Sequence, residues 1–239
     1  MAFPPSVDRR QALEAHFLFR NLREAEITAL LARSRVEHKR ANELIFRKDS
    51  PGHGLMAVLS GQVKISMLSS NGREVVLNII NPGEVVGEMA LLDGKPRSAD
   101  ATAMTACELL VIDRRDFMPF LEQHPEIAIR LLGVLSERLR HSSNQVHDIL
   151  FLDLRGRLAK ALLRLAEHHD HQPPVKGKQI DIKLSQRELG NLIGQSRESV
   201  NKQLRAWQKA KLLMIERGRI VLLDRAGIQA EADFGPSVE

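Results

Sequence analysis

The sequence predicts an α+β protein that begins with an antiparallel β domain, continues into a long helix and ends in a small helical domain. Three observations support this order. Short apolar runs alternate with turn residues over about 36–113, an apolar heptad pattern occupies the middle of the chain, and two short amphipathic segments meet at a glycine near the C-terminus. We expect three parts with the boundaries 1–124, 125–153 and 154–239.

The N-terminal segment is expected to be one helix over 9–34, because its apolar residues recur at helical spacing. The residues that follow this spacing are Leu13, Phe17, Leu18, Leu22, Ile27, Leu30 and Leu31.

Four apolar runs then predict strands of antiparallel sheets. The runs end at turn residues such as Asn71-Gly72 and Pro82-Gly83, and Asn-Gly is typical of a tight hairpin. Their spacing of about 8–12 residues favours a sandwich or barrel over a parallel sheet. The runs are Leu55–Leu59, Val63–Leu68, Val75–Ile80 and Leu109–Ile112.

A long helix is expected after Pro125, which suits the first turn of a helix. Its apolar positions alternate steps of four and three, which is the seam of a coiled coil. Such a seam needs a partner helix, either from a second copy of the chain or from its own domain. The heptad spacing of the apolar residues ends at 151–153, where we expect a hinge. The seam residues are Ala128, Leu132, Leu135, Leu139, Ser142, Val146 and Ile149, and Ser143 lies beside them.

The C-terminal part carries the excess positive charge. The net charge is +5, with −1 in residues 1–153 and +6 in residues 154–239. This distribution favours a polyanionic partner, although a solvated basic surface without a partner stays an alternative. Aromatic residues make up 4% of the chain and tyrosine is absent, which argues against base stacking on a single strand and leaves duplex DNA open. We expect the segment after Asp224 to fray.

Several classes of protein are excluded by composition. No apolar run reaches the ~18 residues of a membrane span, and the first residues lack the apolar core of a secretory signal. The single cysteine, Cys107, excludes an intramolecular disulfide and a four-cysteine metal site. We therefore expect a cytoplasmic protein without a metal. The histidines at 168, 169 and 171 are expected to face solvent in a polar loop rather than to bind a metal.

The segment 87–99 has the residue types of an anion site. Gly87 allows a ligand to approach the backbone, and one helical turn over 88–92 would present free N–H groups, those of Met89 and Ala90 among them. Arg97 supplies a forked cationic donor and Ser98 a hydroxyl.

The carboxylate of Glu88 does not suit a phosphate, but it suits a sugar hydroxyl of the same ligand. A phosphate together with a ribose hydroxyl describes a nucleotide. Because the lysine loop GxxxxGK[ST] is absent, hydrolysis of a triphosphate is not expected.

This segment resembles the phosphate-binding cassette of the CRP/FNR family of bacterial transcription regulators, and the resemblance extends over nearly the whole chain. It implies a β-roll (jelly-roll) cyclic nucleotide-binding domain in which Glu88 binds the ribose 2′-hydroxyl, while Arg97 and Ser98 hold the cyclic phosphate. It also implies that Ser142 and Ser143 reach the purine from the dimer helix. The resemblance implies cAMP as the ligand. A Thr-Ser pair is common at this place, and because Ser-Ser departs from it, cGMP stays open.

The second motif, over 184–204, reads as a helix–turn–helix. Ser185 and Glu188 form a capping box for the first helix, and Gly194 suits the turn. Ser196 can cap the second helix, with Ser199 at its third position. The remaining outward-facing residues are suited to base edges and phosphates in the major groove, and the following segment, Leu212–Leu223, reads as a two-stranded wing. The expected DNA-contacting residues are Ser185, Gln186, Ser196, Arg197, Glu198, Ser199, Asn201, Lys202 and, in the wing, Arg217.

The run from Ser196 to Val200 is similar to the family's Ser-Arg-Glu-Thr-Val, which implies TGTGA-like half-sites read by a homodimer and a partnership with RNA polymerase. Lys202 falls where arginine is frequent, so its contact is expected to be less specific for a base. The loop 168–178 is a candidate polymerase contact by the same resemblance.

Other functions were weighed against this one. A kinase regulatory subunit or a channel gating domain would not need the helix–turn–helix, and a cyclic-nucleotide hydrolase would need a metal cluster or a positioned base. An iron–sulfur sensor lacks its cysteines, whereas a haem sensor is harder to exclude because of His16, His38 and His53. A regulator of the same fold that needs no ligand also remains.

Overall fold

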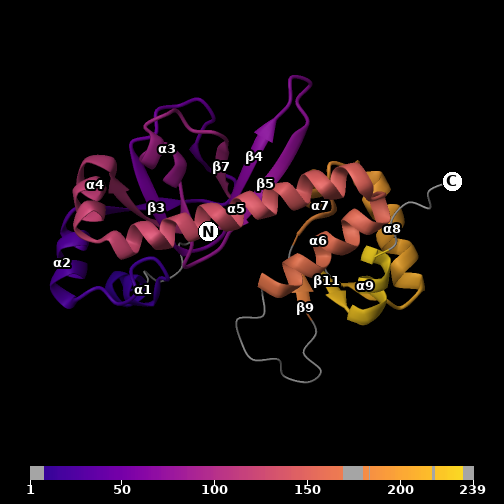
Figure 1. Ribbon diagram of the computed structural model, residues 1–239. Coiled ribbons are helices and arrows are strands. Elements are labelled where there is room, and N and C mark those ends of the chain that lie inside the picture. Colours follow the sequence, from indigo (N-terminus) through magenta and orange to yellow (C-terminus); the bar gives the residue numbers. More distant parts are fainter. Residues whose placement is uncertain (1–7, 169–179, 183, 217–218, 234–239) are drawn as a thin grey trace. The chain divides into compact units, whose positions relative to one another are not determined.

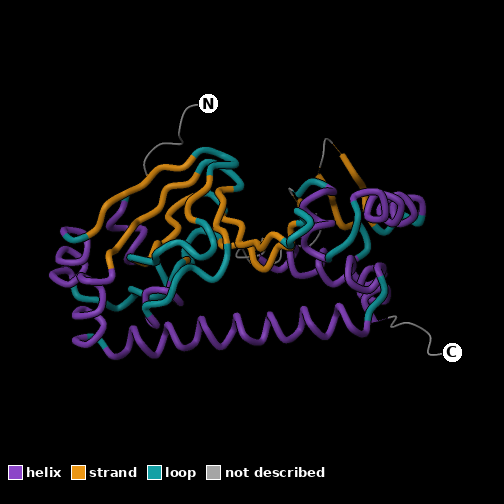
Figure 2. Tube along the Cα trace, turned by 90° about the horizontal axis from the view of Figure 1, so that it is seen from above, coloured by secondary structure: helices purple, strands orange, loops and turns teal. Residues whose placement is uncertain are grey.

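A computed structural model of the protein is shown as a ribbon in Figure 1 and as a tube in Figure 2. The structure describes residues 8–168, 180–182, 184–216 and 219–233. Residue contacts divide the chain into two units, one of 1–68 with 77–139 and one of 69–76 with 140–239. The domain boundaries expected from the sequence stay a prediction.

Two four-stranded sheets make up the β domain, with strand orders β1-β8-β3-β6 and β2-β7-β4-β5. The pairs β1–β8, β3–β8 and β4–β7 are antiparallel. All four predicted strands are confirmed as β3, β4, β5 and β8, and the α+β class with an antiparallel N-terminal domain is confirmed with them. The strands are β1 (Ser34–Lys39), β2 (Leu44–Phe46), β3 (Gly54–Ser60), β4 (Val63–Leu68), β5 (Glu74–Ile80), β6 (Val85–Val86), β7 (Asp100–Ala103) and β8 (Cys107–Asp113).

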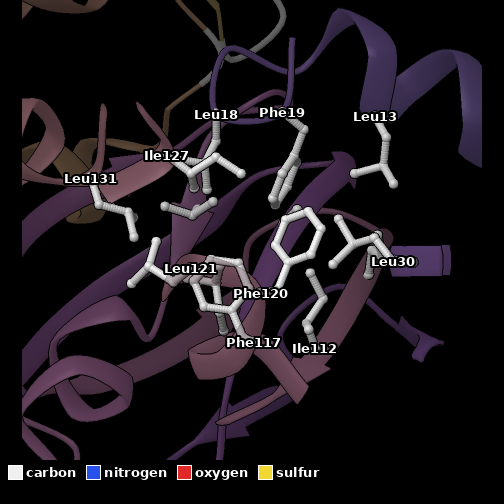
Figure 3. Close-up of a cluster of buried hydrophobic side chains, with 14 of the residues drawn as sticks. Leu13, Leu18, Phe19, Leu30, Ile112, Phe117, Phe120, Leu121, Ile127 and Leu131 are labelled. Carbon is white, nitrogen blue, oxygen red and sulfur yellow. The ribbon is translucent and has the colours of Figure 1, made fainter. Parts of the chain in front are cut away.

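Strand β3 is apolar from Leu55 to Leu59 because side chains on both of its faces are buried. Successive side chains of a strand point to opposite faces. Leu55 and Ala57 pack into a first cluster with helices that precede and follow the strands in the sequence. Met56 and Val58 pack into a second cluster with residues of the other sheet. Burial of one such leucine stabilises the fold by about 2 kcal/mol. Figure 3 labels ten members of the first cluster: Leu13, Leu18, Phe19, Leu30, Ile112, Phe117, Phe120, Leu121, Ile127 and Leu131.

The prediction of one helix over 9–34 is wrong, because the structure has two helices, α1 (Arg9–Ala15) and α2 (Glu24–Ala32). The chain leaves α1 at His16, whose backbone is extended, and Asn21 adopts a left-handed conformation with φ 75°. The apolar residues between the two helices still enter the core, so helical spacing alone did not distinguish a helix from a folded-back loop.

His16 fastens this loop to the segment that leads into β6. Its ring is buried, its Nδ1 accepts a hydrogen bond from the backbone N–H of Leu18 at 3.2 Å, and its Nε2 lies 3.3 Å from the carbonyl oxygen of Glu84. A neutral ring with the proton on Nε2 satisfies both contacts. Burial lowers the pKa of His16 to about 4, against an ordinary value of 6.5.

Two helices follow the last strand of the β domain. Helix α4 (Arg114–Gln123) was not predicted, whereas α5 (Pro125–Phe151) begins at the expected proline and continues unbroken for 27 residues. Ile127 and Leu131 pack into the first cluster. Most of the predicted seam is exposed in the single chain, with Leu132, Leu139, Val146 and Ile149 between 55% and 69% accessible.

Besides the C-terminal part of α5, the described residues of the second unit form four helices and a small sheet with strand order β10-β11-β9. The expected break after α5 is confirmed as an element boundary. Fraying after Asp224 is contradicted, because α9 buries Ile228 and is tied to α6 by two hydrogen bonds between Arg155 and Glu231. The elements are α6 (Leu154–His168), β9 (Ile180–Ile182), α7 (Gln186–Ile193), α8 (Arg197–Lys209), β10 (Leu213–Glu216), β11 (Arg219–Leu222) and α9 (Arg225–Asp233). Within the described ranges no helix has the length and apolarity to cross a bilayer.

Acid should weaken the fold through His16. The folded protein holds the ring neutral down to a pKa of about 4, while the unfolded chain takes up a proton near pH 6.5. Stability from this group is therefore complete above pH 6.5 and is lost as the pH falls toward 4, with a loss of about 2 kcal/mol at pH 5. Urea unfolding at pH 7.5 and pH 5 measures the difference. The His16→Gln variant should lose this part of the pH dependence, and equal slopes for both proteins would contradict the assignment.

Candidate functional site

The predicted anion segment lies directly after β6. Gly87 has φ 85° and precedes the short helix α3 (Glu88–Asp93), so the expected helical turn is confirmed. A Cβ on Gly87 would lie 2.2 Å from Nη1 of Arg97. Glycine is therefore required both by the left-handed backbone and by the close approach of the guanidinium.

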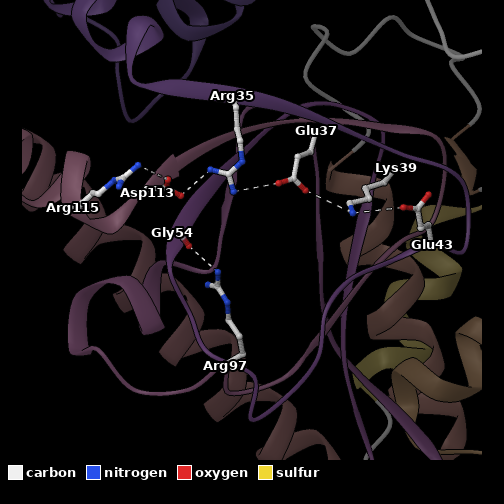
Figure 4. Close-up of polar contacts among 8 residues, drawn as sticks. All are labelled: Arg35, Glu37, Lys39, Glu43, Gly54, Arg97, Asp113 and Arg115. Atoms are coloured by element: carbon white, nitrogen blue, oxygen red, sulfur yellow. Dashed lines mark hydrogen bonds and ion pairs between the residues drawn. The ribbon is translucent and has the colours of Figure 1, made fainter.

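Arg97 points into the domain and is only 4% exposed. Its Nη1 donates to the carbonyl of Gly87 at 2.8 Å, and its Nη2 donates to the carbonyl of Gly54 at 2.9 Å. Figure 4 shows the second contact apart from the surface ion pairs of β1, which include Arg35 and Asp113. Burial lowers the pKa of Arg97, and the nearby charge of Glu88 opposes that shift.

The buried carboxylate of Glu88 forms an ion pair with the half-buried Arg138, a residue of α5 that the sequence did not single out. Arg138 also donates from Nη2 to the carbonyl of Val85 at 2.5 Å. The signal for Arg138 was present in the sequence, since it lies four residues before Ser142 and therefore on the same helix face as that predicted site residue. The first unit thus brings Glu88, Arg97 and Arg138 to one place.

Two polar atoms of this cluster are buried without a hydrogen-bond partner among the described residues: Oε2 of Glu88 and Nε of Arg97. Buried polar groups are normally paired, so each such atom needs an explanation. A carboxylate oxygen accepts a hydrogen bond from a hydroxyl, and an arginine N–H donates to an anion. One ligand with a hydroxyl and an anionic group would satisfy both atoms.

The other predicted ligand residues differ in exposure, and they do not belong to the cluster of Glu88, Arg97 and Arg138. Ser98 is exposed, and its hydroxyl donates to the sulfur of Met89 at 3.7 Å. Ala90 is buried, whereas Met89 is 48% exposed. Ser142 and Ser143 are exposed on the part of α5 that belongs to the second unit, so their contact with a ligand stays a prediction.

The helix–turn–helix is confirmed in α7 and α8. The hydroxyl of Ser185 accepts from the N–H of Glu188, whose carboxylate accepts from the N–H of Ser185 at 2.7 Å, which is the predicted capping box. Gly194 ends α7 with φ 68°, and Ser196 caps α8 by accepting from the N–H of Ser199 at 3.1 Å. The inward faces bury Leu189, Ile193, Val200, Leu204 and Trp207.

The outward residues of α8 are available to a partner. Arg197, Glu198 and Lys202 are exposed, and Asn201 is half-buried. The pKa of Glu198 is lowered by hydrogen bonds from its own N–H and from the Ser196 hydroxyl, which keeps this carboxylate charged. In α7, Gln186 is half-buried, and Ser185 before it is exposed. The predicted wing strands are confirmed as β10 and β11, while Arg217 lies outside the described residues.

Histidine, cysteine and acidic side chains bear on the metal-based alternatives in the described part of the chain. No group of three histidine, cysteine or acidic side chains is placed to hold a metal ion there. Both ring nitrogens of His16, one of the haem-ligand candidates, already make hydrogen bonds. His169 and His171 of the histidine loop and the candidate polymerase loop beyond 168 lie outside the described residues.

Removal of the Arg138 guanidinium should leave the Glu88 carboxylate buried and unpaired. We expect Arg138→Met to lower the free energy of unfolding by about 3 kcal/mol, measured by urea denaturation. Glu88→Gln in the same background should recover part of this loss, because the amide carries no charge. Arg115→Met, at a side chain 84% exposed, is the control and should change stability by less than about 0.5 kcal/mol. Unchanged stability of Arg138→Met would contradict a structural role for the pair.

Comparison with known proteins assigns a domain family to each of two parts of the chain. The sequence pattern of the cyclic nucleotide-binding domain matches residues 36–124, and that of the Crp-like helix-turn-helix domain matches residues 156–231. The chain is 33% identical over 206 residues to a CRP-like cAMP-activated global transcriptional regulator of Mycobacterium tuberculosis, covering 86% of this chain and 91% of that protein. It is 33% identical over 169 residues to the cAMP-activated global transcriptional regulator CRP of Salmonella typhimurium, covering 70% and 80%.

Solved structures agree with this assignment. The c-di-GMP responsive global regulator CLP of Xanthomonas campestris matches with a TM-score of 0.70 and 29% identity over 84% of this chain and 99% of that one. A CooA mutant from Carboxydothermus hydrogenoformans has a TM-score of 0.75 at 21% identity over 91% and 95%, which shows a common fold. With both domains matched in this order and one third of the residues identical over most of its length, the chain belongs to the CRP/FNR family of transcription regulators.

Proposed function

We propose that the protein is a transcription regulator whose binding to duplex DNA is switched by a cyclic nucleotide, with cAMP as the ligand. The observation that carries this proposal is the pair of buried, unpartnered atoms on Glu88 and Arg97. A cyclic nucleotide offers a ribose hydroxyl to the first and a monoanionic phosphate to the second. The printed names of the relatives from M. tuberculosis and S. typhimurium, both cAMP-activated regulators, support cAMP over other nucleotides.

In this proposal different protein groups contact the ribose, the phosphate and the purine of the ligand. Glu88 accepts from the 2′-hydroxyl, Arg97 and the Ser98 hydroxyl hold the phosphate, and two serines of α5 reach the purine. The backbone at the start of α3 lines the phosphate. The ligand-contacting residues are Gly87, Glu88, Met89, Ala90, Arg97, Ser98, Ser142 and Ser143. The protein does not transform the ligand and is not an enzyme in this proposal.

We propose a homodimer formed through α5. The exposed apolar residues Leu132, Leu139, Val146 and Ile149 recur at heptad spacing, and a row of this kind is normally covered by a second helix. Two copies would present two α8 helices to half-sites about 34 Å apart, which suits a palindromic TGTGA-like site. Contacts with DNA come from Ser185, Gln186, Ser196, Arg197, Glu198, Ser199, Asn201, Lys202 and Arg217. RNA polymerase is the proposed second partner, and the cytoplasm, where the chromosome lies, is the proposed location.

Isothermal titration of the full chain with cAMP, cGMP and c-di-GMP tests the ligand. We expect cAMP to bind and Arg97→Gln to weaken it by about 30-fold or more, because a buried charged contact to the phosphate is lost. Glu88→Gln should weaken it by about tenfold, since an amide oxygen is a poorer acceptor than a carboxylate. Arg115→Gln is the control at an exposed site. Failure of the wild-type protein to bind any of the three compounds would overturn the proposal, and a preference for cGMP or c-di-GMP would overturn cAMP as the ligand.

Gel-shift affinity for a TGTGA-type palindrome tests the coupling to DNA. Saturating cAMP should tighten DNA binding by about 5- to 150-fold, the range of typical allosteric coupling, and the DNA should tighten cAMP binding by the same factor. Arg197→Ala should cost about 1–3 kcal/mol and relax specificity at one base pair, with cAMP affinity in the absence of DNA unchanged. Equal DNA affinity with and without cAMP would leave the ligand-independent regulator as the correct reading.

A further inference from the structure

Phe46, the last residue of β2, lies against the guanidinium of Arg97. The Cζ atom of Arg97 is 4.3 Å from the centroid of the Phe46 ring. A cation within about 6 Å of an aromatic face is attracted by the ring's quadrupole. Phe46 lies far outside the cassette 87–99, so the motif alone gives no sign of this contact.

The segment after Phe46 is hydrogen-bonded to the backbone on both sides of the Arg97 side chain. The N–H of Arg97 donates to the carbonyl of Ser50 at 2.9 Å, and the carbonyl of Arg97 accepts from the N–H of Asp49 at 2.8 Å. The N–H of Lys48 donates to the carboxylate of Asp100 at 2.7 Å. These bonds hold the segment that follows Phe46 beside Arg97, which brings the ring within reach of the guanidinium.

Arg97 needs such support because burial disfavours its charge, even with the carboxylate of Glu88 nearby. Its side chain is buried, its two Nη groups reach neutral carbonyls, and its Nε is unpartnered among the described residues. A long, mobile cation in this position gains hydration by turning toward water. The ring face adds an attraction to that of the two carbonyls, and it covers one face of the guanidinium while the N–H groups at the edge stay directed at acceptors.

We propose that Phe46 is a positioning residue for the anion-binding arginine: its ring holds the Arg97 guanidinium in the site by a cation–π contact before the ligand arrives. The inference rests on the proposed function, because the anion concerned is the phosphate of the cyclic nucleotide. A ligand that binds only the inward conformation of Arg97 has an apparent affinity reduced by the fraction of molecules that hold it. Phe46 therefore raises affinity without touching the nucleotide.

A series of fluorinated phenylalanines at position 46 separates this electrostatic role from packing. Fluorine withdraws charge from the ring face and weakens the cation–π contact, while the ring keeps nearly its shape and stays apolar. Titration of the full-length protein with cAMP should give an affinity that falls step by step from phenylalanine through mono- and difluoro- to trifluorophenylalanine, by about tenfold in total. Phe46→Leu, which removes the ring face, should weaken binding at least as much.

The same substitutions at Phe117 are the matched control, because that ring packs against Phe120 in the first cluster. Fluorination there should leave cAMP affinity unchanged, and thermal unfolding of every variant checks that it is folded. Equal affinity across the series at position 46 would overturn the positioning role while leaving the proposed function intact. Absence of cAMP binding by the wild-type protein would overturn both.

Discussion

The burial of two opposite charges in one domain is the constraint on which the site depends. Glu88 and Arg97 lie where side chains lose most of their hydration, and a charge in such a place is tolerated only with partners. Arg138 supplies the partner for one oxygen of Glu88, and backbone carbonyls and an aromatic ring support Arg97. One atom on each of Glu88 and Arg97 nevertheless has no hydrogen-bond partner within the described residues, and a ligand can supply the two missing hydrogen bonds.

The scaffold explains why these charges stay in place. Gly87 leaves room for the guanidinium, and the Nε of Arg114 donates at 2.7 Å to the carbonyl of Leu91 near the end of α3. His16 binds the carbonyl of Glu84, which lies just before β6 and the cassette. The N-terminal helices, the sheet and α4 therefore all act on the same short stretch of backbone. Functional sites of this kind are held by neighbours whose own positions are fixed by packing.

Sequence reasoning succeeded where residue type and spacing carry the chemistry. The helical turn after Gly87, the caps of α7 and α8, the turn at Gly194 and the start of α5 all depend on local rules, and the structure bears them out. It failed where tertiary contacts determine the end of a helix, the position of a strand or the membership of the site. The loop after α1 keeps helical spacing but is drawn out of the helix by His16 and Asn21. β1 is a charged edge strand and β6 has two residues, so neither shows an apolar run. Arg138 and Phe46 become part of the site only through folding, because they come from α5 and β2.

The double-sided burial of β3 and β8 has a consequence for how the β domain opens. Both strands contribute to the cluster against the helices and to the cluster against the second sheet, so the two layers share their central strands. Loss of either layer would leave the same backbone half exposed to water. The layers therefore melt together as a single cooperative unit, and the amide hydrogens of these strands should exchange with solvent only through global opening of the domain.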